Sequence, residues 1–167
     1  MPFKSRTKLA PSFLAGLLLL PLAAAAQSAS NAFDTQVWVN PGIYSHHFDR
    51  DKDFRSNNVG FGVEVALAPE HRALAGSFIN SERERTRYVA WNWRPLQWKP
   101  GGVDVSAGII AGAFDGYPRY RGGGWFAAAM PVLSIEGRRV GVNLSIIPTI
   151  PDRLSGAVAV QVKLRAW

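Results

Sequence analysis

The sequence predicts an all-β protein: a closed, eight-stranded, antiparallel up-and-down β-barrel that crosses a membrane, with both termini on the periplasmic side. Three observations predict this fold class. Apolar residues alternate with small or polar ones along eight segments, no window after residue 27 carries a long helical stripe, and short connections alternate with longer polar ones. The length of 167 residues fits one domain, and a hydrophobic content of 47% excludes a disordered polar chain.

The expected strands follow in chain order: Gln36–Phe48, Val59–Leu67, Arg72–Asn80, Tyr88–Leu96, Val103–Phe114, Trp125–Ile135, Val140–Pro148 and Ala157–Trp167. In segment 59–67 the odd-numbered residues are large and apolar, whereas the even-numbered ones are Gly, Glu or Ala. A face of small and polar residues suits a narrow lumen, and an apolar face suits lipid. A soluble β-barrel or sandwich in the periplasm would alternate in the same way and is the structural alternative.

The connections support the barrel because their lengths alternate. Links 68–71, 97–102 and 136–139 are short, and links 49–58, 81–87, 115–123 and 149–156 are longer and polar, as in outer-membrane barrels. We expect interfacial aromatic side chains at Trp38, Trp91, Trp93, Trp98 and Trp125. The chain ends on Trp167, which strict alternation would point inward unless the strand frays or bulges there.

The first 26 residues have the pattern of a secretory signal peptide. Lys4, Arg6 and Lys8 precede an apolar run over residues 13–20 and a small-residue stretch that ends at Ala26. We expect cleavage after Ala26, with cleavage after Ala29 as the alternative. Residues 27–167 then form a single outer-membrane barrel domain.

Charge and composition exclude several function classes. The net charge of +7 falls to +4 when the three basic residues of the signal peptide are removed, and an exported chain has little access to nucleic acid. Anionic lipid headgroups are better partners. The absence of cysteine excludes a disulfide scaffold, a zinc ribbon and a thiol nucleophile. We expect no metal and no organic cofactor.

Histidines are the scarcest chemistry-bearing residues, and two of the three fall at one rim of the predicted barrel. His46 and His47 are consecutive, so on a strand they point to opposite faces and make a poor metal site. Asn80 and Ser81 close the third strand at the same rim. A histidine within hydrogen-bond reach of Ser81 could activate its hydroxyl for acyl transfer.

Several segments, in the same order, resemble the PagP family of outer-membrane lipid A palmitoyltransferases. They are Pro41-Gly42-Ile43-Tyr44-Ser45-His46, Gly60-Phe61-Gly62, Phe78-Ile79-Asn80-Ser81, Trp93-Arg94-Pro95-Leu96, Pro131-Val132-Leu133 and Ile146-Ile147-Pro148. The likeness covers about residues 37–167. It implies an enzyme that moves a fatty acyl chain from a phospholipid donor to the lipid A of lipopolysaccharide in the outer membrane. We expect a monomer, the default for a barrel this small.

The resemblance also implies site residues. The family's catalytic histidine maps best to His46 because its spacing from Pro41 agrees, and His47 stays open because the loop after it is shorter here. The family serine maps to Ser81. The family aspartate maps to Asn80, which can orient a partner but cannot act as a base. Glu82 or Glu84 could supply the missing charge, or the protein could be inactive.

The resemblance gives further residues a role in substrate binding. Tyr88 stands where the family uses a small residue to set the floor of the acyl pocket, so we expect a preference for chains shorter than palmitate. Arg83, Arg85 and Arg87 could hold lipid A phosphates, although Glu82 and Glu84 could instead neutralise them. Pro41 and Pro148 lack the N–H that a ladder needs, and the family uses such wall gaps as lateral doors for lipids.

A second function stays open. The chain has too few residues before its first strand for the family's amphipathic helix, and Asn80 departs from the family pattern. Both departures favour a non-catalytic small barrel that binds lipid or has a structural role.

Overall fold

The computed structural model describes residues 34–49, 51–150 and 154–167. The predicted signal peptide, residues 1–26, lies outside the described residues. In the part of the chain that is described, no helix is long and apolar enough to cross a membrane.

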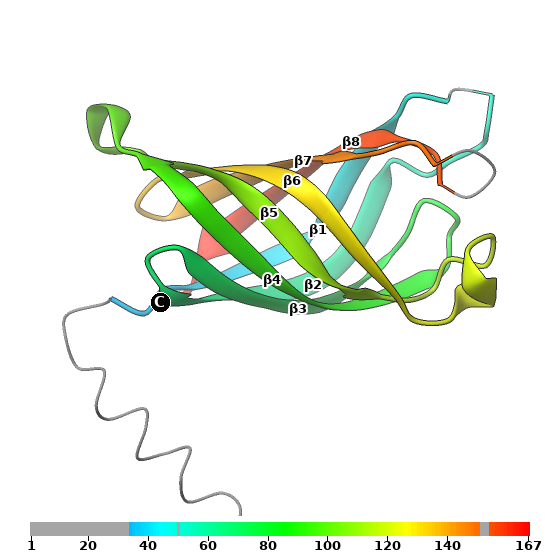
Figure 1. The fold of residues 1–167 in the computed structure, drawn as a ribbon, viewed down its shortest axis with the longest axis horizontal. Coiled ribbons are helices and arrows are strands. Elements are labelled where there is room, and N and C mark those ends of the chain that lie inside the picture. Colours follow the sequence, from blue (N-terminus) through cyan, green and yellow to red (C-terminus); the bar gives the residue numbers. More distant parts are fainter. Residues whose placement is uncertain (1–33, 50, 151–153) are drawn as a thin grey trace, which may run out of the picture. The chain divides into compact units, whose positions relative to one another are not determined.

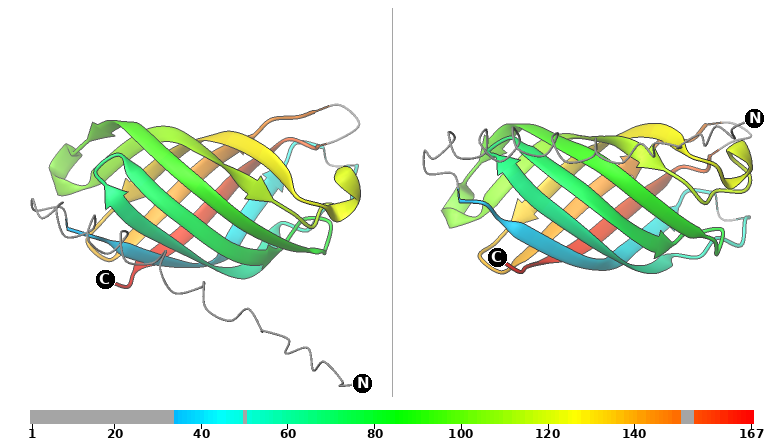
Figure 2. Two further views of the ribbon diagram at one scale, coloured as in Figure 1. Left: turned by 60° about the horizontal axis from the view of Figure 1, so that its bottom comes forward. Right: turned by 90° about the horizontal axis from the view of Figure 1, so that it is seen from below.

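The described residues form a closed barrel in which each strand pairs with its neighbour in the sequence and β1 pairs with β8 (Figures 1 and 2). The strands are β1 Val37–His47, β2 Asn57–Ala68, β3 His71–Ile79, β4 Arg85–Trp98, β5 Asp104–Phe114, β6 Phe126–Glu136, β7 Val140–Ile147 and β8 Ala157–Arg165. All eight adjacent pairs are antiparallel. The prediction of an all-β, eight-stranded antiparallel barrel is confirmed.

The two ends of the barrel differ. Three short turns, β2–β3, β4–β5 and β6–β7, lie at the end where the chain terminates, which we call the turn end (Figure 1). The β1–β2, β3–β4, β5–β6 and β7–β8 loops lie at the opposite end, which we call the rim. The β3–β4 loop, 80–84, is only as long as the β4–β5 turn, 99–103, so the expected alternation of lengths does not hold for this pair. Two short 3-10 helices, Pro100–Gly102 and Arg121–Gly123, sit in connections at the turn end and the rim respectively.

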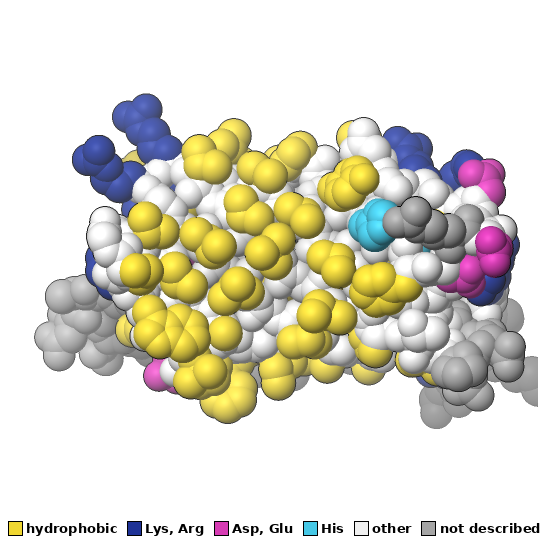
Figure 3. Space-filling view, turned by 90° about the horizontal axis from the view of Figure 1, so that it is seen from above, with side chains coloured by type: hydrophobic (Ala, Val, Ile, Leu, Met, Phe, Trp, Pro, Cys, Tyr) yellow, Lys and Arg dark blue, Asp and Glu magenta, His cyan; other side chains and the backbone are white. Residues whose placement is uncertain are grey.

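Large apolar side chains cover the outer face of the wall, and Lys and Arg gather at both ends (Figure 3). The outward side chains of Phe61 and Val89, for example, are both 62% exposed. A continuous apolar surface of this extent is unfavourable in water. Trp91, Trp93, Trp98 and Trp125 are exposed as expected. The expectation for Trp38 is wrong, because its ring is fully buried inside the barrel, where Lys163 and Arg165 lie over it at 5.2 and 4.9 Å.

The turn-end half of the lumen holds a network of buried charges. Lys163 Nζ lies 2.8 Å from Glu64 Oε1 and 2.6 Å from Glu136 Oε1, and Arg72 and Arg94 also contact Glu136 at 2.9 and 3.1 Å. Asn143 donates to Glu64 and to Gln161. The partners come from β2, β3, β4, β6, β7 and β8, so the network links strands across the barrel.

A buried apolar cluster lies on the rim side of this network. Six buried side chains form one cluster, and three partly buried ones pack against it: Leu74, Phe78, Tyr88, Ala90, Ile110 and Val132, with Ile43, Phe114 and Met130. Beyond the apolar cluster, toward the rim and the predicted site residues, buried polar side chains follow again, among them Ser45, Asn58, Asn80 and Thr86.

The two widest interruptions in the hydrogen-bond ladder of the described wall lie between β1 and β8 and between β6 and β7, and each has proline at or next to it. A shorter interruption falls at Pro95 in the β4–β5 pair, between Trp93 and Leu96. Between the pairs Val39↔Leu164 and Tyr44↔Val160, β1 has no partner residues in β8, and Pro41 lies in this interval. β6 pairs with β7 only over Val132–Glu136, so its rim half, 126–131, has no ladder partner there. Pro131 lacks an N–H, and Pro148 follows directly after the end of β7.

The C-terminal residue does not point inward. Strand β8 ends at Arg165, and the backbone N–H groups of Ala166 and Trp167 both donate to Val37 O, at 2.8 and 3.2 Å. Two residues thus face one, as in a bulge. The side chain of Trp167 is 79% exposed, so this irregularity removes the conflict with strict alternation.

Candidate functional site

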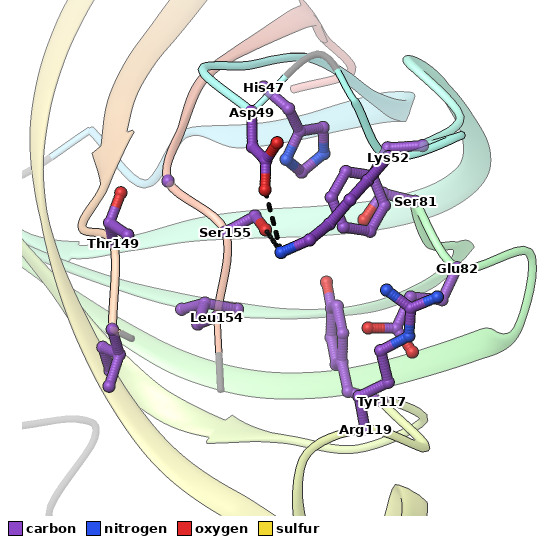
Figure 4. Close-up of a pocket in the computed structure, with 13 residues that line it drawn as sticks. His47, Asp49, Lys52, Ser81, Glu82, Tyr117, Arg119, Thr149, Leu154 and Ser155 are labelled. Atoms are coloured by element: carbon purple, nitrogen blue, oxygen red, sulfur yellow. Dashed lines mark hydrogen bonds and ion pairs between the residues drawn. The ribbon is translucent and has the colours of Figure 1, made fainter. Parts of the chain in front are cut away.

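A pocket of about 200 Å³ opens at the rim, among its loops. It is lined by residues from the end of β1, from the β1–β2, β3–β4, β5–β6 and β7–β8 loops, and by none of the small residues of the mid-barrel wall. Figure 4 shows its labelled side chains, which include His47, Asp49, Lys52, Ser81 and Tyr117. Its walls combine two hydroxyl-bearing serines, one imidazole and both signs of charge.

The pocket contains His47 rather than His46. His46 is exposed on the outer face, and His47 is half-buried and lines the pocket together with Ser81, which is 8% exposed. The structure therefore brings Ser81 to the alternative histidine of the pair. No hydrogen bond joins the two side chains within the described residues.

The imidazole of His47 is oriented by two residues that the sequence reasoning missed. Its Nε2 atom lies 3.4 Å from Ser45 Oγ, and Ser45 Oγ accepts a hydrogen bond from Asn58 Nδ2 at 2.8 Å. If Nε2 carries the proton and donates to Ser45, the lone pair of Nδ1 is free to act as a base. Nδ1 is buried and has no hydrogen-bond partner among the described residues. The ring of Phe54 packs against the imidazole at 4.5 Å.

Lys52 links two sides of the pocket mouth. Its Nζ atom lies 2.8 Å from Asp49 Oδ2 and donates to Ser155 Oγ at 3.2 Å. The hydrogen bond from Lys52 holds the pKa of Asp49 below its ordinary value. On the opposite wall, burial raises the pKa of Tyr117 to about 12. Its phenol therefore stays protonated at physiological pH and can serve as a donor.

Asn80 is fully buried beside the pocket, and its side chain is hydrogen-bonded to the loop residues around it. Its Nδ2 atom donates to Gly116 O at 2.6 Å and to Thr86 Oγ1 at 3.1 Å. Its Oδ1 atom accepts from the backbone N–H groups of Glu82 and Glu84, at 2.9 and 3.1 Å. These four hydrogen bonds use the amide fully, and none of them reaches a histidine.

The three arginines predicted to hold phosphates differ in their contacts. Arg83, in the β3–β4 loop, pairs with Asp53 of the β1–β2 loop at 2.8 Å, and Nε of Arg87, in β4, donates to Asp115 of the β5–β6 loop at 2.7 Å. Their carboxylate partners are not Glu82 and Glu84. Arg85 contacts only Ser77 Oγ, at 3.4 Å, and forms no ion pair with a described residue. Arg119, at the pocket wall, likewise forms no ion pair within the described part of the chain and lies over the Phe54 ring at 5.8 Å.

Tyr88 points into the lumen and fills it. Its ring packs against Phe78 and Phe114, with centroids 5.9 and 6.0 Å away. A Cβ atom added at Gly62 would lie 2.2 Å from its hydroxyl, so the hydroxyl rests on backbone that only glycine can provide. Tyr88, Phe78 and Phe114 therefore occupy the lumen at this level.

In the described ranges no group of three or more His, Cys, Asp or Glu residues is placed to hold a metal ion.

The fold and the pocket define a small closed β-barrel with an imidazole and a serine at one rim. A comparison with known protein families finds no family model that matches the chain, and a comparison with curated proteins finds no matching relative.

Proposed function

We propose that the protein is an outer-membrane enzyme that transfers a fatty acyl chain from a phospholipid to the lipid A of lipopolysaccharide, as its resemblance to the PagP family implies. The observation that carries the proposal is the pocket that His47 and Ser81 share at the rim of a barrel with an apolar outer face. A site at this level would meet lipid headgroups and the start of their acyl chains.

Membrane insertion is supported by the closed wall and by its outer surface. A closed ladder leaves no open sheet edge toward lipid, and the exposed Trp91, Trp93, Trp98 and Trp125 are the residues that membrane interfaces favour. The barrel termini at the turn end would then lie in the periplasm, which agrees with export through an N-terminal signal.

In the proposed reaction His47 is the general base. It takes the proton from the attacking hydroxyl as that oxygen bonds to the donor's ester carbonyl, and the ester bond to the phospholipid breaks. The proton returns to the leaving oxygen, which gives a lysophospholipid and an acylated lipid A. Ser81 either forms the acyl intermediate or donates a hydrogen bond to the substrate. Ser45 and Asn58 are positioning residues for the imidazole.

Access and phosphate recognition also have candidates. A lipid chain could pass the wall at two places. One is between β7 and the rim half of β6, which has no ladder partner in β7, and the other is between β8 and the Pro41 interval of β1. Arg85 and Arg119 are better candidates for lipid A phosphates than Arg83 and Arg87, because the latter two already have carboxylate partners.

The test is a turnover assay on purified protein in vesicles that contain phospholipid and lipid A. The proposal expects lysophospholipid and acylated lipid A to appear together, with both lost in His47→Ala and in Ser81→Ala. His46→Ala is the matched control, because it removes the outward imidazole and should keep activity. A folded, inserted wild-type protein that forms neither product would contradict the proposal.

The second candidate function is a non-catalytic lipid-binding barrel. A specific observation favours it: Tyr88, Phe78 and Phe114 fill the lumen, and the remaining rim pocket of about 200 Å³ is smaller than the roughly 300–1,000 Å³ of most ligand sites. Lipid binding by the wild type without either product would support this candidate.

A further inference from the structure

At the turn end, far from the rim pocket, a groove of about 780 Å³ lies between the β6–β7 turn and the end of β8. Its lining residues are Gly137, Arg138, Arg139, Val140 and Arg165, which include three arginines and no carboxylate. Arg138 and Arg139 are exposed. The groove is therefore a concentrated positive charge on the surface.

Nothing in the described part of the chain neutralises these arginines. Arg138, Arg139 and Arg165 form no ion pair there, although nine other ion pairs are present. The guanidinium of Arg165 lies 4.9 Å from the Trp38 ring centroid, and its Nε atom is buried without a hydrogen-bond partner. An unpaired buried donor of this kind favours an anion.

The buried network next to the groove carries no excess negative charge. It contains three cations, Arg72, Arg94 and Lys163, and two carboxylates, Glu64 and Glu136. Lys163 approaches the face of the Trp38 ring at 5.2 Å, and Arg165 also lies over this ring. The network therefore adds to the positive potential of the groove instead of cancelling it.

The backbone fixes the groove. The N–H of Arg165 donates to Arg139 O at 2.8 Å, and the N–H of Gly137 donates to Val140 O at 2.8 Å. Val140 and Leu164 are direct register partners across β7 and β8. The turn is thus already held to its neighbouring strand before a ligand binds, so binding would lose little conformational entropy in ordering the turn.

The groove borders the apolar outer face. Val140 and Leu164 are each 52% exposed, and Val162, on the same face of β8, is 47% exposed. A cationic groove that continues into an exposed apolar stripe fits a molecule with an anionic head and a hydrocarbon tail. Free phosphate shares the head but not the tail.

We propose that this groove binds the phosphate of an anionic phospholipid in the periplasmic leaflet, with an acyl chain along Val140, Leu164 and Val162. The inference rests on the membrane insertion stated under the proposed function and is independent of acyl transfer. The lipid phosphate would receive hydrogen bonds from Arg138 and Arg139, and from Arg165 at the inner end of the groove. The site would fix the depth and rotation of the barrel in the bilayer.

The test is native mass spectrometry of the detergent-solubilised full-length protein titrated with phosphatidylglycerol, with phosphatidylcholine, and with inorganic phosphate as competitor. The variant is Arg138→Gln/Arg139→Gln, and the control is Lys99→Gln/Arg121→Gln, which removes the same charge outside the groove. Each arginine near an anionic lipid contributes roughly a fivefold preference, so the variant should weaken phosphatidylglycerol binding about 30-fold and the control should leave it near wild type.

Three results would overturn the proposal: equal binding of the two lipids, unchanged phosphatidylglycerol binding in the groove variant, or complete displacement of the lipid by inorganic phosphate at equal concentration. The last would identify a free phosphate as the ligand. Vesicle flotation of the same protein separates the two proposals. A protein that floats and binds the lipid but forms no acylated product contradicts only the proposed function, and one that does not float contradicts the insertion on which both depend.

Discussion

Position 80 carries an amide whose two donors and two acceptor positions are all used by the loop around it. A carboxylate could keep the bonds from the Glu82 and Glu84 N–H groups but could not donate to Gly116 O or Thr86 Oγ1. An asparagine at the position where the resemblance to the PagP family would place an aspartate therefore has a structural reason in this chain. It connects the β3–β4 and β5–β6 loops beside the pocket.

We predict that Asn80→Asp destabilises the protein. The substitution places a carboxylate oxygen against Gly116 O, where Asn80 Nδ2 now lies at 2.6 Å, and leaves that carbonyl without its donor. The expected loss is about 1–3 kcal/mol in the free energy of unfolding, measured by denaturant titration of the reconstituted protein. Wild-type stability in Asn80→Asp would show that these bonds contribute nothing.

Tyr88 gives a prediction about substrate length that rests on the proposed function. Replacing it with glycine removes the ring that packs between Phe78 and Phe114 and opens space within the apolar cluster of the lumen. Tyr88→Gly should therefore shift the preferred acyl donor to longer chains, measured with phospholipids of graded chain length. Tyr88→Phe keeps the ring and should keep the wild-type profile. An unchanged chain-length profile in Tyr88→Gly would show that the Tyr88 ring does not determine the preferred chain length.

At the scale of elements, strand β1 shows why the choice between His46 and His47 could not be made from the sequence. Simple alternation from the buried Trp38 and Asn40 would continue through His46 as an inward residue. Relative to β8, strand β1 has one extra residue between Val39 and Tyr44, so Ser45 and His47 face inward instead. Spacing from Pro41 identifies the segment, but only the bulge decides which imidazole faces inward.

The bulge in turn depends on Gly42. Its φ of 123° is a conformation that residues with a side chain rarely adopt, and an added Cβ atom would lie 2.1 Å from Asn58 O. We predict that Gly42→Ala costs about 1–3 kcal/mol of stability from backbone strain alone. It should also reduce acyl transfer, because the strain would displace both His47 and Asn58.

Thermal unfolding and the turnover assay measure the two effects of Gly42→Ala. Gly124→Ala is a suitable control, because its φ is −73° and an added Cβ atom would approach only Arg121 O, at 3.3 Å. Equal stability of Gly42→Ala and wild type would contradict the role given to this glycine.

At the scale of the whole molecule, alternation and connection lengths predict the closed barrel, because both follow from local sequence. The faces of Glu64 and Lys163 follow from the same parity. Their pairing across the lumen does not, because it joins residues 99 apart in the sequence, Lys163 Nζ and Glu64 Oε1. Trp38 also differs from its expected position at the membrane interface. It lies inside the barrel, where its ring contacts Lys163 and Arg165 of the distant strand β8.

The buried network predicts an asymmetry between its members. Glu136→Gln would leave three cations against one carboxylate, whereas Lys163→Met would leave two against two. Breaking a buried pair costs about 3–5 kcal/mol when a charge is left uncompensated. We therefore expect Glu136→Gln to lower the free energy of unfolding by about that amount, and Lys163→Met to lower it less. The reverse order in urea titration would contradict this description of the network.

The central claim is that His47 and Ser81 make the barrel a lipid A acyltransferase. The most direct test is mass spectrometry of lipid A from cells that express the wild-type protein, His47→Ala, Ser81→Ala or His46→Ala. The account predicts a mass gain of one acyl chain with the wild type and His46→Ala, and no gain with the other two. No mass gain with a folded wild-type barrel in the outer membrane, or a gain that persists in Ser81→Ala and His47→Ala, would contradict it.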